Sequence, residues 1–484
     1  MKILAIETSC DETSVAVVED GVKLHSLVIN SQIDIHKAFG GVVPEIAARS
    51  HIEVMLPVVQ QALSEAFGTQ SYESRVMSQE EDKKSATHDT NLIPHKSMAS
   101  HWDQIDAIAV TQGPGLSGSL LIGVLTARTL AWSFNKPLYP VHHILGHVYA
   151  NWITEQALET DARIMTQESR IQTPGRHSRA GGNPVDLTER SETAPPQTTN
   201  YELPSNVPEF PVLALIVSGG HTQLMLGTDH ENWRVIGRTQ DDAVGEAFDK
   251  VAKVLGLPYP GGPSVAKVAE GGDPKRYILP TPKVSTIDPG LLELRSRIVD
   301  HSNDQHRHSQ LDWESSNNVI AGSDVKSNWI PDQVGHDRQK KLQSTESYNF
   351  SFSGLKTAVL RAVQKECGVA HDFPSFELSA LLSDAQKANF AASFEYTAIN
   401  YLVAKTKLAF EEFQPKTFIL GGGVAASLPL RKALSDALPI EIEYAPQILC
   451  TDNAAMIGAR AYYQMQSEDP VDPHTLEVKP SWPL

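Results

Sequence analysis

Two histidines four residues apart are the side chains of this sequence best suited to bind a metal. His143 and His147 lie in the segment PVHHILGHVYANW. A helix there would place both imidazoles on one face, with Cβ atoms about 6 Å apart. That spacing suits two ligands of a single ion. The alternative is that the two side chains cap the helix or form ordinary hydrogen bonds.

A third ligand for the same ion is Asp452. It lies far downstream in the polar cluster CTDN, directly before the apolar segment AAMIGARAYY. Two histidines and one carboxylate leave coordination positions open for substrate oxygens, which suits Fe(II), Zn or a similar ion acting as a Lewis acid. Because no glutamate follows His143, the pattern is not the HExxH of zinc peptidases, and this helix lacks a general base for peptide hydrolysis.

Strands, glycine turns and helices recur along the chain and must position these ligands. Residues 2–7 and 14–18 predict a hairpin whose tip, 8–13, is small and acidic. Four more segments predict strands, three of which lead into glycine-rich turns or loops: 105–110, 212–217, 222–226 and 417–420. A further helix is expected over 427–438. This alternation indicates an α/β fold.

The hairpin-first pattern occurs near the start and again after Pro211. We therefore predict two related lobes that face each other across a cleft. Glycines at strand ends let a backbone approach phosphate oxygens closely and offer N–H groups to them. Several such turns in one chain favour a nucleotide-like ligand.

Two other polar segments have less specific patterns. Asp242, Glu246 and Asp249 would share one helical face, and the favoured interpretation is an exposed acidic surface balanced by lysines. The segment NFSFS, residues 349–353, alternates phenylalanine and polar residues and predicts a strand that leads into a helix.

Length and composition limit the class of protein. A chain of 484 residues suggests two or three domains. The net charge of −17 argues against broad nucleic-acid binding by the chain alone, although a local basic patch or a partner can supply it. Three scattered cysteines favour a reducing compartment. Neither a secretory signal nor a membrane span is indicated, so we expect a cytoplasmic protein without a membrane partner.

Three polar, aperiodic segments interrupt the pattern at about residues 69–101, 161–208 and 295–348. A compact domain rarely carries structureless loops of that length, so they are predicted to be insertions into a smaller core.

Taken together, the motifs resemble a known family. In chain order they are ETSCDETSVAVV, GGVVPEIAARSH, QGPGLSGSLLIG, HHILGH, VSGGHTQL, DDAVGEAFDK, YPGGP, FSFSGLKTA, GGGVAAS, CTDNAAMIGA and PSWPL. This ordered set is similar to that of the tRNA N6-adenosine threonylcarbamoyltransferases. The resemblance covers nearly the whole chain except the three polar segments.

The resemblance implies a two-lobed actin/sugar-kinase/Hsp70-like fold with duplicated RNase H-like lobes. The first lobe would span 1–140 and be completed by 453–484, and the second would span 141–452. It implies transfer of threonylcarbamoyl from threonylcarbamoyl-AMP to N6 of adenosine 37 in tRNAs that read codons beginning with A. One divalent metal, Fe(II) before Zn, would be held by His143, His147 and Asp452.

The family also implies where the substrate and the partners bind. The substrate-binding positions correspond to Ile216, Val217, Ser218, Gly219, Gly220, Asp249, Gly262 and Ser427, the last in place of the family's asparagine. Asp11 and Glu12 at the first hairpin tip are candidates to assist proton removal from N6. Bacterial members act on tRNA with a smaller homologous subunit and a P-loop ATPase. The alternatives are an actin-like ATPase or kinase, and a non-catalytic scaffold, which would lack the three metal ligands.

Overall fold

Two five-stranded mixed sheets form the framework of the protein. The computed structural model describes residues 1–68, 101–154, 207–281 and 348–484, and the three predicted insertions lie outside this part of the chain except at their edges. The strand order is β3-β2-β1-β4-β5 in one sheet and β10-β9-β6-β7-β8 in the other. In each sheet a three-stranded antiparallel meander is extended by two parallel strands. The prediction of an α/β fold is confirmed.

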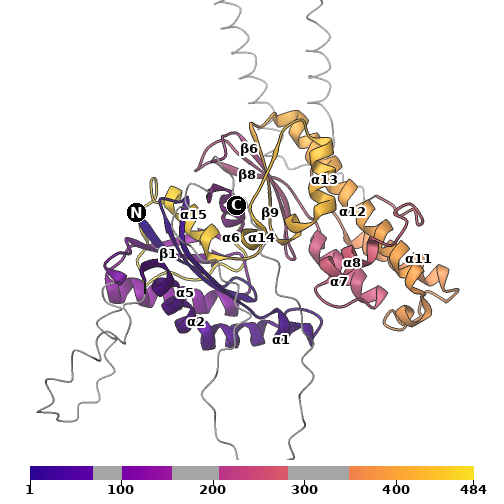
Figure 1. Cartoon of the computed structure of the whole chain (residues 1–484), viewed down its shortest axis with the longest axis horizontal. Coiled ribbons are helices and arrows are strands. Elements are labelled where there is room, and N and C mark those ends of the chain that lie inside the picture. The colour runs from indigo at the N-terminus through magenta and orange to yellow at the C-terminus, as the bar shows by residue number, and fades with distance from the viewer. Residues whose placement is uncertain (69–100, 155–206, 282–347) are drawn as a thin grey trace, which may run out of the picture.

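The first sheet is covered by helices on both faces (Figure 1). Its strands are β1 (Lys2–Glu7), β2 (Glu12–Glu19), β3 (Lys23–Ser31), β4 (Ala107–Gly113) and β5 (Leu138–His142). Leu4 and Ile6 pack toward α2 (Pro44–Phe67) and α5 (Ser117–Phe134), whereas Ile3 and Ala5 belong to the core on the opposite face. Because side chains alternate across a strand, both faces of this hydrophobic strand are buried. The short helix α1 (Ile33–Lys37) follows β3.

Helix α15 (Ala454–Gln464) covers that opposite face, although it comes from the end of the chain. A Cβ atom on Gly458 would lie 2.8 Å from Cγ2 of Val18, so the helix backbone rests directly on the sheet. Helix α6 (His143–Tyr149), which continues from β5 and leads to η1 (Ala150–Trp152), packs against α15. The two segments that carry the candidate metal ligands are therefore neighbours.

The second sheet contains β6 (Val212–Val217), β7 (Thr222–Gly227), β8 (Trp233–Arg238), β9 (Thr417–Gly421) and β10 (Ile442–Tyr444). Its helices lie together on the right of Figure 1. They are α7 (Val244–Leu255), α8 (Gly261–Ala269), α11 (Ser353–Glu366), α12 (Asp384–Phe413) and α13 (Leu428–Ala437). Short segments complete the described chain: η3 (Leu378–Leu381), η4 (Gly423–Ala426) and α14 (Gln447–Cys450).

The predicted strand at residues 349–353 is wrong. Phe350 forms only an isolated bridge to Thr239, and helix α11 begins at Ser353. The reason is the Asp241 carboxylate, which accepts hydrogen bonds from the backbone N–H groups of Phe352 and Ser353 at 2.7 and 3.2 Å. This side chain satisfies the first free N–H groups of the helix and turns the chain out of an extended conformation.

Within the described part of the chain, no helix is both long enough and apolar enough to cross a membrane.

A cavity of about 260 Å³ lies between α8, α12 and α13, remote from the candidate metal ligands, and Glu395 lines it. Burial, and then the charge of Glu270, raise the pKa of the Glu395 carboxyl from 4.5 to about 7. The folded protein therefore binds a proton more tightly there than the unfolded chain does. The stability that this proton contributes is complete below pH 4.5 and is lost as the pH rises toward 7.

Replacing Glu395 with glutamine is expected to remove this pH dependence. The variant should unfold at higher urea than the parent at pH 8, with a gain below about 1 kcal/mol because the side chain is partly exposed to solvent, and should match the parent at pH 4.5. Urea unfolding at both pH values measures the difference, and the exposed Glu231→Gln is the control. An equal effect of Glu395→Gln at both pH values would contradict the assignment.

Candidate active site

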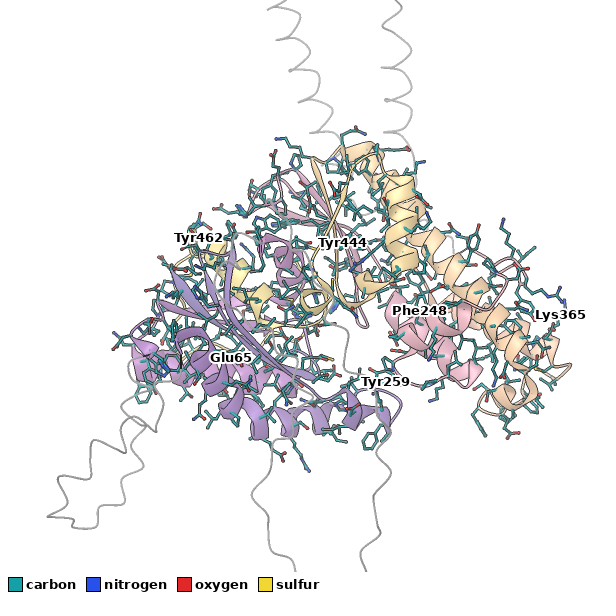
Figure 2. All side chains as sticks on the ribbon, in the orientation of Figure 1. Glu65, Phe248, Tyr259, Lys365, Tyr444 and Tyr462 are labelled. Carbon is teal, nitrogen blue, oxygen red and sulfur yellow. The ribbon has the colours of Figure 1, made fainter. Side chains whose placement is uncertain are left out.

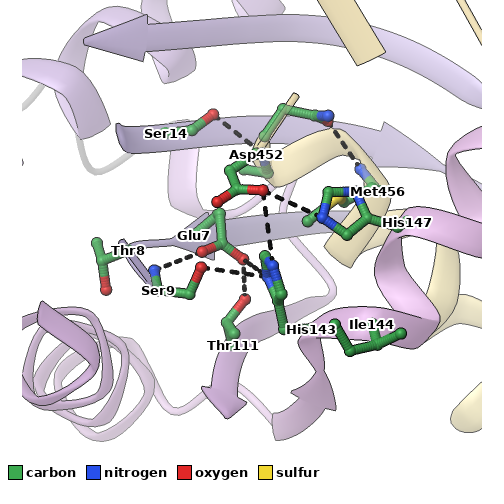
Figure 3. A network of polar contacts seen from close by, with 12 residues as sticks. Glu7, Thr8, Ser9, Ser14, Thr111, His143, Ile144, His147, Asp452 and Met456 are labelled. Atoms are coloured by element: carbon green, nitrogen blue, oxygen red, sulfur yellow. Dashed lines mark hydrogen bonds and ion pairs between the residues drawn. The ribbon is translucent and has the colours of Figure 1, made fainter. Parts of the chain in front are cut away.

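His143, His147 and Asp452 meet at one point in the structure (Figure 3). Asp452 Oδ1 lies 3.1 Å from His147 Nε2 and 3.6 Å from His143 Nε2. One potential ligand atom from each residue lies within 4.8 Å of the other two. Both histidines are buried, and Asp452 is partly exposed. Three atoms in this arrangement can surround one cation and leave a side open.

Hydrogen bonds at the N-termini of α6 and α15 fix the two segments that carry the candidate ligands. His142 caps helix α6, because its Nδ1 accepts from the Ile144 backbone N–H at 3.2 Å, and its Nε2 lies 2.9 Å from the Trp482 carbonyl in the C-terminal segment. Asn453 caps helix α15 by accepting from the Met456 N–H at 3.1 Å. The ligands are thus attached to two helix N-termini, where backbone direction is well fixed.

Close packing of α6 on α15 requires a small residue between the two ligand histidines. A Cβ atom on Gly146 would lie 2.9 Å from Cδ1 of Ile457 and 3.2 Å from Cγ of Met456. The glycine of the HILGH segment therefore lets the histidine helix approach the helix that Asp452 precedes.

The buried polar atoms of His143, His147 and Asp452 are better satisfied by a bound metal ion than by hydrogen bonds to one another. Neither ring nitrogen of His147 has a hydrogen-bond partner among the described residues, although both are buried. The 3.1 Å contact to Asp452 is short enough for an ion pair but lacks hydrogen-bond geometry. Buried polar atoms without partners are costly, and a cation between them would satisfy all three groups.

The electrostatics of the cluster also favour a cation. Burial lowers the pKa of His143, but Asp452 and Glu7 outweigh it and raise that pKa to about 9. Burial raises the pKa of Asp452, and the two ligand histidines outweigh it, so Asp452 is ionised. The carboxylates of Asp452 and Glu7 therefore make the site electrostatically favourable for a positive charge, either a proton or a metal ion. The geometry accommodates a single metal ion.

Four residues that the sequence did not single out lie near His143: Glu7, Ser9, Thr111 and His221. The Glu7 carboxylate lies 3.2 Å from His143 Nδ1 and is itself contacted by Ser9 and Thr111. The ring of His221 lies 6.2 Å from that of His143, measured between centroids. The sequence signal that could have identified Glu7 is its position as an acidic residue at the end of the mostly apolar strand KILAIE.

The first hairpin tip is held beside this cluster. His51 connects α2 to it through contacts with Thr13 Oγ1 at 2.7 Å and the Cys10 carbonyl at 3.0 Å. Asp11 is buried and Glu12 is partly buried. Burial, then the charges of Asp11 and Asp452, raise the pKa of Glu12 well above its ordinary value. Glu12 is therefore close enough to Asp452 to interact with it electrostatically.

A tight turn after β6 contains the residues expected to bind substrate. Ile216 and Val217 are buried in the strand, and Ser218 closes the turn by two hydrogen bonds with His221, at 2.8 and 3.1 Å. Gly219 and Gly220 are exposed, and a Cβ atom on either would meet nothing within 4 Å. The turn therefore has open space at both glycines, where a ligand can approach the backbone.

The remaining expected positions have structural contacts as well. Asp249 accepts a 2.6 Å hydrogen bond from the Gly261 N–H at the start of α8, next to Gly262. Ser427 caps α13 by accepting from the Leu430 N–H at 3.4 Å. Tyr259 lies between the α7–α8 pair and the elements of the first sheet in Figure 2. Burial, then Asp11 and Asp249, raise the pKa of Tyr259, so carboxylates from both sides of Tyr259 act on it electrostatically.

The acidic segment before and within α7 is divided in the structure. Lys250 lies 2.6 Å from Asp242 and 2.8 Å from Glu246, so these two carboxylates form a surface ion-pair network. Asp249 faces Gly261 instead. The interpretation as a balanced acidic surface holds for the first two residues only.

Fold and site together define an α/β protein with a candidate single-metal centre. The family model described as TsaD, tRNA N6-adenosine threonylcarbamoyltransferase, matches residues 23–72, 95–178, 197–296 and 320–459. The chain belongs to this family.

Curated relatives with the same name align with this chain over nearly their whole length. The protein of Thermomicrobium roseum is 36% identical over 96% of this chain and 92% of its own. The relative from Moorella thermoacetica is 34% identical over 100% and 97%, and that from Bacillus subtilis is 34% identical over 95% and 89%. A more distant match among solved structures is component A of (R)-2-hydroxyglutaryl-CoA dehydratase from Acidaminococcus fermentans. It is 9% identical, the alignment covers 97% of this chain and 100% of that chain, and the TM-score is 0.37.

Proposed function

We propose that the protein transfers threonylcarbamoyl from threonylcarbamoyl-AMP to N6 of adenosine 37 in tRNAs that read codons beginning with A. Family membership supports the transferase class. The observation that carries the proposal for this chain is the convergence of His143, His147 and Asp452 near the glycine turn, whose His221 ring lies 6.2 Å from that of His143 between centroids. A non-catalytic scaffold would not need these three ligands.

The glycine turn is proposed to bind the acyl-adenylate. Backbone N–H groups at Gly219 and Gly220 would hold phosphate oxygens, as such turns do in other nucleotide sites. Ile216 and Val217 form the strand end below the turn, whereas Asp249, Gly262 and Ser427 would contact the remaining part of the adenylate. A serine at position 427 keeps one hydroxyl for such a contact where the family has an asparagine amide.

The reaction needs an activated carbonyl, because the lone pair of the adenine N6 amine is delocalised into the ring. N6 attacks the carbamoyl carbon, a C–N bond forms, the bond to the phosphate oxygen breaks and AMP leaves. We assign removal of the N6 proton to the carboxyl groups of Asp11 and Glu12, since the first hairpin tip that carries them lies beside the metal ligands. The divalent ion, Fe(II) before Zn, would supply Lewis-acid stabilisation of charge on the threonylcarbamoyl oxygens when bound.

We further propose that the two sheets are the lobes of an actin/sugar-kinase/Hsp70-like fold. Their equivalent strand order and strand directions support this proposal. The proposed boundaries are 1–140 with 453–484 for one lobe and 141–452 for the other, and the packing of α15 on the first sheet agrees with them. The proposed partners are tRNA, a smaller homologous subunit and a P-loop ATPase, in the cytoplasm.

A transfer assay tests the proposed function. The purified chain is combined with the two partner proteins, ATP, threonylcarbamoyl-AMP and a tRNA with an intact anticodon loop, and the modified nucleoside is measured by mass spectrometry. Formation of the modified nucleoside that depends on this chain is expected. ATP hydrolysis by the chain without tRNA modification would instead indicate an actin-like ATPase, and unchanged modification without it would indicate that the chain is dispensable.

A further inference from the structure

Glu7 is the least exposed acidic side chain around the metal ligands. It ends strand β1, is 0% exposed, and has no Lys or Arg partner among the described residues. Its Oε1 accepts from the Ser9 backbone N–H at 2.5 Å, and its Oε2 accepts from the Thr111 hydroxyl. Thr111 belongs to β4, which pairs with β1. One donor from the turn after β1 and one from β4 therefore hold the carboxylate in one orientation.

The group that this carboxylate faces is His143. Oε2 of Glu7 and Oγ of Ser9 both lie 3.2 Å from Nδ1 of His143, while Nε2 of the same ring points to Asp452 at 3.6 Å (Figure 3). A neutral imidazole can offer a lone pair to a metal at only one nitrogen, and the other must then carry a proton. The protonated nitrogen needs an acceptor, and Glu7 is the anionic one available.

The two ligand histidines differ in this respect. Nδ1 of His147 is buried and has no hydrogen-bond partner among the described residues, so no protein group fixes the tautomer of that ring. Among the two ligand histidines, His143 is therefore the one whose tautomer a neighbouring side chain, the Glu7 carboxylate, can fix.

We propose that Glu7 is a positioning residue that accepts the Nδ1–H of His143 and thereby keeps Nε2 free to bind the metal. This inference rests on the proposed metal site. It requires no contact between Glu7 and the substrate. Groups of this kind contribute about 10- to 100-fold to metal affinity in other proteins.

The substitution Glu7→Gln tests this role with little change in shape. The Ser9 N–H is fixed by the backbone, so the amide oxygen faces it and the NH₂ group faces His143 Nδ1. That group donates, which drives the imidazole proton to Nε2 and removes the lone pair that a metal needs. We expect the Zn²⁺ dissociation constant of the full-length protein, measured by chelator competition, to rise about 10- to 100-fold.

Two further variants make the result specific. Thr111→Val keeps the Glu7 carboxylate but removes one of its donors, and should weaken Zn²⁺ binding by a smaller factor, about 3- to 10-fold. Glu395→Gln is the same acid-to-amide change at a partly buried carboxyl remote from the site, and should leave Zn²⁺ affinity unchanged. The unfolding midpoint of each metal-free variant shows that the comparison is made between folded proteins.

The outcomes separate the inference from the function on which it rests. A folded Glu7→Gln protein that binds Zn²⁺ as tightly as the parent would overturn the role of Glu7 alone. If Glu7→Gln does not fold, the test is made with Thr111→Val. A folded Thr111→Val protein that binds Zn²⁺ as tightly as the parent would then overturn the role of Glu7. If the parent chain binds no Zn²⁺, both the proposed metal site and this inference are wrong.

Discussion

Replacing His147 with alanine is expected to reduce both metal binding and threonylcarbamoyl transfer by more than about 100-fold, beyond the loss for groups that only orient a ligand. His147 would supply one of the three ligand atoms, and its Nε2 lies closer to Asp452 Oδ1 than Nε2 of His143 does. The fold should persist, because neither ring nitrogen forms a hydrogen bond within the described structure. Metal content after dialysis and the tRNA modification assay measure the two losses.

The matched control is His371→Ala, which removes an exposed histidine from a loop after α11. It should retain metal and activity. Normal transfer by a folded His147→Ala protein would show that the histidine pair is not a ligand set, and the alternative of helix-face histidines would then stand.

The second large effect is expected from alanine at Gly422. This residue has φ +86° and ψ 164°, a region that is essentially open only to glycine. An alanine Cβ would also lie 2.5 Å from the carbonyl oxygen of Val217, the last residue of β6. Backbone strain and the contact together should lower the free energy of unfolding by about 2–4 kcal/mol. Urea denaturation measures this change.

Gly422→Ala should also impair substrate binding, because Val217 directly precedes the turn that contains Gly219 and Gly220. A higher KM for threonylcarbamoyl-AMP is therefore expected in any folded fraction. Gly423→Ala provides a neighbouring control, since its Cβ would meet nothing within 4 Å, and its stability should stay within about 1 kcal/mol of the parent. Equal effects of the two substitutions would contradict the proposed contact between the glycine turns.

The predicted elements around the site were largely confirmed because their signals are local. Buried apolar runs next to glycine turns predicted β6, β7 and β9 within a residue or two. The error at residues 349–353 arose because Asp241, more than a hundred positions earlier, caps the helix there. Alternation of apolar and polar residues carries no information about such a distant carboxylate.

Sequence by itself determined the ligand types, the helical spacing of His143 and His147, and the glycine turns, since each depends on a few adjacent residues. Tertiary structure decided what lies around them. Packing of α15 on α6 brings Asp452 to 3.1 Å from His147, and pairing of β1 with β4 directs Glu7 at His143. Such contacts join residues separated by long stretches of chain, so only the folded backbone brings them together.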